Sequence, residues 1–133
     1  MESGIPVPTG GRGGPEHEYW KARVAQHLRD LGFLVEVEKP TGGGQTIDLV
    51  ATKDGQTLAV EVETGTSDVA ANIRKCIRFG CQRVLVLGTS AHAMHHISQS
   101  LRDLDTATPE RVSVLDVQSF LEGDDLGITA PTS

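Results

Sequence analysis

The sequence predicts an α/β protein with a mixed central sheet flanked by helices. Apolar residues recur at helical spacing near the N-terminus, two β-like runs joined by a short turn follow, and later apolar runs alternate with amphipathic segments. The predicted order is a helix, three strands, a helix and a strand, followed by a further helix and strand. Helical crossovers after a three-strand meander imply both antiparallel and parallel strand pairs, with helices on the two faces of the sheet.

Length and composition indicate one ordinary soluble domain. The 133 residues suffice for one hydrophobic core and are too few for two, and the chain is 38% hydrophobic and 23% charged. The sequence contains neither a secretory-signal pattern nor a run of about 18 apolar residues that would span a membrane. Cys76 and Cys81 are too few for a disulfide scaffold, so we expect reduced thiols and a cytoplasmic location.

Three regions differ in composition. Residues 1–14 are rich in glycine and proline and have no apolar period, which predicts a disordered N-terminal arm. Residues 15–122 carry all the periodic segments and are expected to form a single domain. Residues 123–133 are expected to form a flexible tail.

The first elements follow from local patterns. A helix is predicted from Pro15 to Gly32, because proline suits a first helical turn and glycine a helix end. Apolar and polar residues alternate over 33–38, which predicts a half-exposed strand. The glycine-rich segment 39–45 is expected to be a flexible loop.

A hairpin is predicted next. Residues 46–51 and 57–64 are β-like runs, and the segment between them contains the pair Asp54-Gly55. An Asp-Gly pair between two such runs favours a tight antiparallel turn.

The remaining elements alternate between helix and strand. Residues 66–68 offer N-cap side chains for a helix that ends at Gly80, and 83–88 is a wholly apolar strand of the kind buried on both faces. The pattern then predicts a helix carrying Met94, Ile97, Leu101 and Leu104, a strand over 111–115 and a final helical turn over 117–121.

Three acidic residues lie within the apolar strands of the hairpin. Glu61 and Glu63 point to the same face because side chains alternate along a strand, and the hairpin brings Asp48 beside Glu61. Acids in apolar strands are costly unless they are paired or bind a cation. Three converging carboxylates would suit Mg²⁺ or Mn²⁺. The alternative is a solvated sheet face on which these acids have no chemical role.

Charge is unevenly distributed. A net charge of −6 argues against a protein that coats nucleic acid nonspecifically. Residues 72–83 nevertheless contain four basic residues and no acid: Arg74, Lys75, Arg78 and Arg83. A basic helix beside an acidic metal site suits phosphodiester chemistry, and an ordinary solvated helix face explains the same pattern equally well.

The element order and the placement of the acids resemble the PD-(D/E)XK nuclease superfamily, in particular archaeal Holliday-junction resolvase-like endonucleases. The matching motifs are Leu31-Gly32-Phe33, Ile47-Asp48-Leu49 and Val60-Glu61-Val62-Glu63, within a resemblance that covers residues 15–88. The resemblance implies a restriction-endonuclease-like αβββαβ core. It also implies metal-dependent hydrolysis of DNA phosphodiester bonds, with branched or structured DNA as a candidate substrate.

The motifs depart from the family pattern at three positions. Ile47 stands where the family has proline, a position that carries no chemistry, and Glu63 replaces the lysine of Glu-x-Lys. Lys75, two turns into the next helix, is the predicted substitute for that lysine. Alignment on Gly32 puts Lys21 where the family's first helix supplies a glutamate.

Two neighbouring glutamates of the first helix are candidates to replace that missing acid. Glu16 lies nearer the apolar stripe of this helix than Glu18, so Glu16 is the predicted contributor. His17 is also close enough to that stripe to approach the metal site.

The resemblance therefore implies a complete site. Asp48, Glu61 and the carbonyl of Val62 would hold Mg²⁺ or Mn²⁺, Glu63 would be a further ligand or act through a water, and Lys75 would stabilise the transition state. Symmetric cutting of two DNA strands needs two sites, which is consistent with a homodimer. The alternative function is a catalytically inactive nuclease-fold module that binds nucleic acid or protein within a larger assembly.

Overall fold

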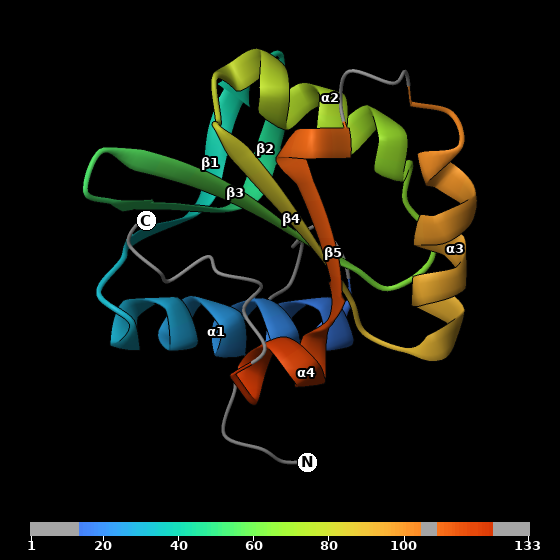
Figure 1. Ribbon diagram of the computed structural model, residues 1–133, viewed down its shortest axis with the longest axis horizontal. Coiled ribbons are helices and arrows are strands. Elements are labelled where there is room, and N and C mark those ends of the chain that lie inside the picture. The colour runs from blue at the N-terminus through green and yellow to red at the C-terminus, as the bar shows by residue number, and fades with distance from the viewer. Residues whose placement is uncertain (1–13, 105–108, 124–133) are drawn as a thin grey trace.

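A five-stranded mixed sheet lies between two pairs of helices (Figure 1). The computed structural model describes residues 14–104 and 109–123. Helices α1 (Pro15–Asp30) and α4 (Val117–Leu121) cover one face of the sheet, and α2 (Val69–Phe79) and α3 (Ala91–Leu101) cover the other. The predicted α/β class with a mixed, helix-flanked sheet is confirmed.

The strands follow one another across the sheet in chain order. The β1–β2 and β2–β3 pairs are antiparallel, whereas β3–β4 and β4–β5 are parallel. The parallel pairs are connected by α2 and α3, and a short 3₁₀ turn, Pro109–Arg111, precedes the last strand. The strands are β1 (Leu34–Gly42), β2 (Gln45–Lys53), β3 (Gln56–Glu63), β4 (Arg83–Gly88) and β5 (Val112–Asp116).

The first strand is longer than the sequence predicts. The expected loop over 39–45 is wrong, because β1 continues to Gly42 and pairs with β2, leaving a turn at Gly43 and Gly44. Pro40 is accommodated because β1 lies at the edge of the sheet, where a strand residue need not donate a backbone hydrogen bond to a second neighbour.

The predicted hairpin between β2 and β3 is confirmed. Asp54 and Gly55 have φ angles of 53° and 78°, as a two-residue type I′ turn requires. Pairing begins at Lys53 opposite Gln56 and continues to Leu49 opposite Val60. This register carries Asp48 and Glu61 to the same end of the hairpin.

The helices begin and end where the sequence provides capping groups. Asp68 caps α2 by accepting a hydrogen bond from the backbone of Ala71 at 3.1 Å, and Gly80 ends this helix with a φ of 105°. Ser90 caps α3 in the same way.

The sheet separates two hydrophobic clusters. Val24 and Leu28 of α1 pack with Phe120 of α4 on one face, and Ile73 of α2 packs with Ile97 of α3 on the other. Burying apolar surface on both faces is the main source of stability for such a sheet.

Three further expectations concern the cysteines, the two ends of the chain and membrane-spanning segments. Cys76 and Cys81 are free, as expected, and the structure buries both. The predicted arm and tail, residues 1–14 and 123–133, fall outside the described residues except for Gly14 and Gly123. Within the described part of the chain, no helix is both long and apolar enough to cross a membrane.

Candidate active site

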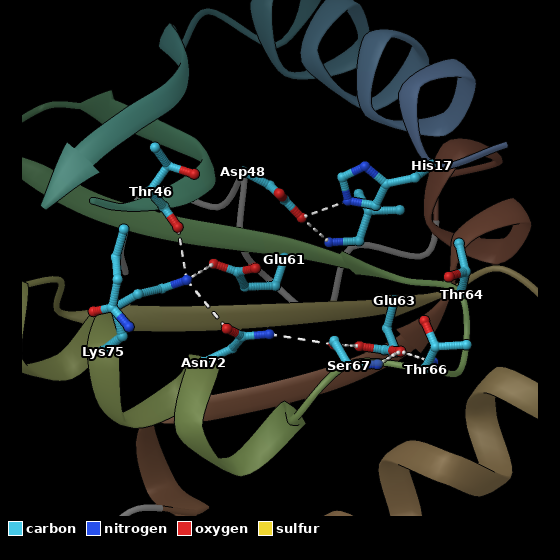
Figure 2. Close-up of a pocket in the computed structure, with 12 residues that line it drawn as sticks. His17, Thr46, Asp48, Glu61, Glu63, Thr64, Thr66, Ser67, Asn72 and Lys75 are labelled. Carbon is cyan, nitrogen blue, oxygen red and sulfur yellow. Dashed lines mark hydrogen bonds and ion pairs between the residues drawn. The ribbon is translucent and has the colours of Figure 1, made fainter. Parts of the chain in front are cut away.

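A pocket of about 400 Å³ opens where β2 begins and β3 ends (Figure 2). Twelve residues line it, contributed by α1, β2, β3, the β3–α2 loop and α2. This is also the end of the sheet at which the parallel strands β3, β4 and β5 finish. Ligands of α/β proteins commonly bind at the carboxyl ends of such strands.

Asp48 lies one residue beyond the last β2–β3 register pair. Its Oδ2 accepts a hydrogen bond from the backbone N–H of Val62 at 2.8 Å and another from His17 Nε2 at 3.0 Å. Burial raises the pKa of Asp48, but the hydrogen bond and charge of His17 outweigh that effect and hold the pKa below its ordinary value. Asp48 is therefore ionised at neutral pH.

Glu61 lies on β3 within the same pocket and is only 7% exposed. Burial raises its pKa to about 8, with a further contribution from the nearby charge of Asp48 and an opposing effect from Lys75. The Cys76 thiol is a further neighbour, 3.6 Å from Oε2. At neutral pH Glu61 therefore retains a proton, whereas its neighbour Asp48 is ionised.

Lys75 of α2 reaches this acid pair, as predicted. Its Nζ lies 3.6 Å from Glu61 Oε2 and donates hydrogen bonds to the carbonyl of Thr46 at 2.6 Å and to Asn72 Oδ1 at 3.1 Å. The lysine is 8% exposed. A basic group from the helix after β3 therefore lies beside the two carboxylates.

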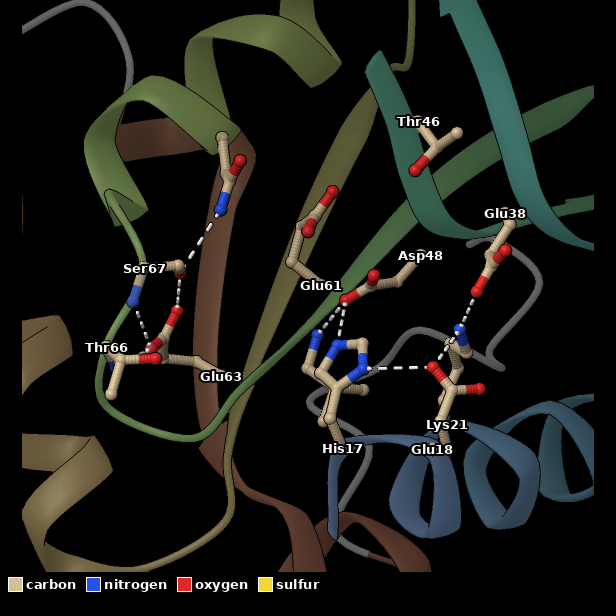
Figure 3. A network of polar contacts seen from close by, with 12 residues as sticks. His17, Glu18, Lys21, Glu38, Thr46, Asp48, Glu61, Glu63, Thr66 and Ser67 are labelled. Atoms are coloured by element: carbon tan, nitrogen blue, oxygen red, sulfur yellow. Dashed lines mark hydrogen bonds and ion pairs between the residues drawn. The ribbon is translucent and has the colours of Figure 1, made fainter. Parts of the chain in front are cut away.

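Glu63 lies in the pocket but is not placed as a metal ligand. Its Oε2 accepts backbone hydrogen bonds from Gly65 at 2.6 Å, Thr66 at 2.9 Å and Ser67 at 3.2 Å. Its Oε1 accepts a hydrogen bond from the Ser67 hydroxyl. The expected role as a direct ligand is corrected, because both oxygens hold the β3–α2 loop (Figure 3). The alternative role of Glu63, action through a water, stays a prediction.

The choice of Glu16 from the first helix is also corrected. Glu16 is exposed and does not line the pocket, whereas the next residue, His17, is buried and hydrogen-bonded to Asp48. One helical residue is a rotation of about 100°, so adjacent positions face different environments. His17, rather than a glutamate, is the α1 residue that enters the site.

Lys21 belongs to an ion-pair cluster that is joined to the site through Glu18, whose Oε2 lies 3.5 Å from His17 Nδ1. It is buried and donates hydrogen bonds to Glu18, at 2.9 Å, and to Glu38 of β1. Figure 3 shows this cluster beside the His17–Asp48 pair. Glu38 is the last residue of the strand expected over 33–38, directly before the segment 39–45 that the sequence predicts as a loop.

The donor set fits a hard divalent cation with few protein ligands. Among residues 14–104 and 109–123, no group of three or more His, Cys, Asp or Glu side chains is arranged to hold a metal ion. Asp48 and Glu61 remain as two oxygen donors. Burial, and after it the charge of Asp48, raises the pKa of Glu61, and a bound cation would offset both effects. Mg²⁺ is commonly bound by one or two carboxylates while keeping several waters.

Comparison with known proteins gives no functional assignment. No protein-family model matches the chain. No curated protein matches it either. Two similar solved structures are described as proteins of unknown function. SPO1766 from Silicibacter pomeroyi is 23% identical, with a TM-score of 0.37, over 51% of this chain and 49% of that one. AF1548 is 17% identical, with a TM-score of 0.48, over 80% of this chain and 66% of that one. The chain thus spans half to two thirds of their length.

The motif comparison missed the two pocket residues that hold Lys75 in place, Thr46 and Asn72. Asn72 precedes Lys75 by three positions on α2, a spacing that places both on one helix face. Thr46 enters through its backbone carbonyl, for which side-chain identity gives no signal. Together these groups hold the Lys75 ammonium beside Glu61, so the pocket combines two acids with a fixed cation.

Proposed function

We propose that this protein is a metal-dependent nuclease that hydrolyses DNA phosphodiester bonds. The observation that carries the proposal is the Asp48–Glu61 pair in an open pocket, with Lys75 Nζ 3.6 Å from Glu61. Two carboxylates and a lysine on consecutive elements are the side-chain types that metal-assisted phosphoryl chemistry uses.

In this proposal Asp48 and Glu61 hold Mg²⁺ or Mn²⁺, and the carbonyl of Val62 is a further candidate donor. The bound ion would supply a Lewis acid that activates water and neutralises phosphate charge. Glu61 must lose its proton to bind the ion, because only the carboxylate is a good ligand. Cation binding is therefore expected to strengthen as the pH approaches 8, the pKa of Glu61.

The other residues act by position and charge. Lys75 is placed to stabilise negative charge on a phosphate that contacts the acid pair. His17 fixes the orientation of the Asp48 carboxylate through its 3.0 Å hydrogen bond. Glu63 holds the loop that precedes α2. This contact fixes the position of α2, and of Lys75 on it, relative to β3.

A catalytically inactive binding module is the second candidate, and one observation favours it. Lys75 already provides Glu61 with a positive partner and uses the Thr46 carbonyl as well, so the pocket has an internal cation. A site of this kind can persist without a metal ion.

A cleavage assay separates the two functions. Full-length protein would be incubated with Mg²⁺ or Mn²⁺ and linear duplex, single-stranded, forked or four-way-junction DNA. We expect metal-dependent cutting that Asp48→Ala abolishes and that Asp103→Ala, which removes an exposed acid outside the pocket, leaves intact.

Titration calorimetry with Mn²⁺ on the same variants gives the second readout. Metal binding without cutting of any substrate would favour the inactive module. Cutting that persists in Asp48→Ala would contradict the assigned site.

A further inference from the structure

A second hollow of about 260 Å³ adjoins the acid pocket. It is lined by Thr41 and Gln45 of the β1–β2 hairpin and by Lys75, Arg78 and Phe79 of α2. Gln45 and Lys75 line both cavities. A ligand bound in the acid pocket therefore lies next to the second cavity.

Arg78 gives this hollow an available positive charge. It is exposed, and within the described ranges its guanidinium makes neither a hydrogen bond nor an ion pair. The surrounding segment of α2 carries Arg74 and Lys75 and has no acid. A free guanidinium next to a site for phosphodiester chemistry is suited to binding a phosphate.

Phe79 provides an exposed aromatic surface beside that charge. It is the last residue of α2 and is 40% exposed, although it is a large apolar side chain. Exposed aromatic rings next to arginine are the usual platform on which proteins stack unpaired bases.

The hairpin supplies a polar edge opposite the ring. Gly42 and Gly43 adopt φ angles of 102° and 63°, which the tight β1–β2 turn requires and side chains disfavour. Thr41 Oγ1 donates a hydrogen bond to the carbonyl of Gln45 at 3.3 Å, which braces the turn. The Gln45 side chain is exposed, and its amide can both donate to and accept from a base edge.

We propose that this hollow binds one unpaired nucleotide next to the phosphate held in the acid pocket. Its base stacks on Phe79 and its phosphate contacts Arg78. The inference deepens the proposed nuclease function and, for its placement beside a scissile phosphate, rests on it. A paired base cannot reach the ring without leaving the duplex, so the substrate is single-stranded or has unpaired bases at a branch.

Fluorescence anisotropy tests the proposal without requiring cleavage. A labelled oligothymidine and a duplex of equal length would be titrated with full-length protein in EDTA. We expect Phe79→Ala to weaken single-strand binding by about tenfold, as loss of one base–aromatic stack predicts, with little change for the duplex. Phe79→Tyr, which keeps a ring, should retain the wild-type preference.

The arginine is tested by salt dependence. Arg78→Ala should reduce the slope of log affinity against log salt concentration by about 0.7 for the single strand, the value for one lost phosphate contact. Matched controls are Arg102→Ala, an exposed arginine that follows the last residue of α3, and Leu34→Ala, an exposed apolar residue at the other end of β1. Neither control should change affinity or slope.

The possible outcomes discriminate between the two proposals. The nucleotide site is overturned if Phe79→Ala lowers affinity equally for the single strand and the duplex, or if it lowers neither. It is also overturned if the wild type does not bind the single strand. A change in molecular mass on light scattering for Phe79→Ala would instead assign the ring to self-association and also overturn it. Selective binding through Phe79 in a protein that cuts no DNA would overturn the nuclease and leave the nucleotide site intact.

Discussion

At the scale of single residues, Glu61 is held in an environment that opposes its charge. A buried carboxylate next to another carboxylate is unfavourable until a proton or a cation neutralises one of them. The pKa of Glu61 rises from 4.5 to about 8, so the folded protein retains a proton that the unfolded chain has lost. The free energy of unfolding should therefore fall as the pH rises from 4.5 to 8.

Glu61→Gln tests whether the ionised carboxylate of Glu61 destabilises the fold. The variant keeps the side-chain shape and removes the charge, so we expect it to be at least as stable as the wild type at pH 9 and to lack this part of the pH dependence. It should also lose Mn²⁺ binding. Urea denaturation at pH 6 and pH 9 measures the first effect, with the exposed Glu110→Gln as a control. A variant that is less stable than the wild type at pH 9 would contradict the like-charge argument.

The contributions of His17 and Asp48 to the free energy of unfolding change with pH in opposite directions. The contribution of His17 is lost as the pH rises, and that of Asp48 is lost as the pH falls. Burial lowers the pKa of His17, but the Asp48 hydrogen bond and charge raise it above 6.5 overall, and Asp48 is shifted below 3.8. The contribution of His17 is full below its unfolded pKa and is lost as the pH rises through its raised folded pKa. The contribution of Asp48 is present above its unfolded pKa and is lost as the pH falls through its lowered folded pKa.

His17→Gln should therefore lower stability most near pH 6 and less at pH 9. We expect a loss of about 1.5–3 kcal/mol at the lower pH, the usual size of a hydrogen bond to a charged group. Chemical denaturation at pH 6 and pH 9 measures this loss of stability. His95→Gln, which alters an exposed histidine of α3, is the control. Equal losses at both pH values would show that His17 contributes packing and no charge.

At the scale of elements, the β3–α2 connection depends on Glu63. Four donors from residues 65–67 converge on this carboxylate. His96 of α3 donates to the Ser67 carbonyl at 2.7 Å and ties the same loop to the next helix. The arrangement fixes where α2 begins and hence where Lys75 lies.

Glu63→Gln should loosen this loop by turning one acceptor into a donor that faces N–H groups. We expect a loss of about 1–3 kcal/mol in stability and faster amide exchange at residues 65–67. Cation binding by Asp48 and Glu61 should persist in the folded variant. If Mn²⁺ binding disappears while stability is unchanged, Glu63 is a ligand after all.

The sequence predicts the elements of this fold better than it predicts their contacts. The Asp54-Gly55 turn and the Asp68 and Gly80 ends of α2 are local signals, and the structure contains them. The extension of β1 through Pro40 depends on being at a sheet edge, a tertiary property that no local pattern encodes.

In the site too, local patterns predict where side chains point but not which groups they contact. Strand alternation predicts the shared face of Glu61 and Glu63, but the turn of the chain after β3 decides that Glu63 binds the loop. The wheel position of Glu16 near an apolar stripe does not show which α1 residue meets Asp48, because that depends on how the helix is rotated against the sheet. Lys75 was predictable because it lies two turns into the helix that follows β3, which brings its side chain back to the acid-bearing end of that strand.

At the scale of the whole molecule, the acid pair lies where elements from both faces meet. His17 comes from α1 on one side of the sheet, and Lys75 comes from α2 on the other. Asp48 and Glu61 lie between them on adjacent central strands. A cation bound here would contact two strands and neutralise the repulsion between them.

Cation binding should consequently stabilise the entire fold. At a Mn²⁺ concentration 100 times its dissociation constant, linkage predicts about 2.7 kcal/mol, or a rise of roughly 10 °C in Tm for a domain of this size. Because Glu61 is protonated below its pKa of about 8, binding at pH 7 should also release a proton. Scanning calorimetry measures the first effect, and titrations in buffers of different ionisation enthalpy measure the second. Asp48→Ala should abolish both and Asp103→Ala neither, whereas stabilisation that survives in Asp48→Ala would place the cation elsewhere on the protein.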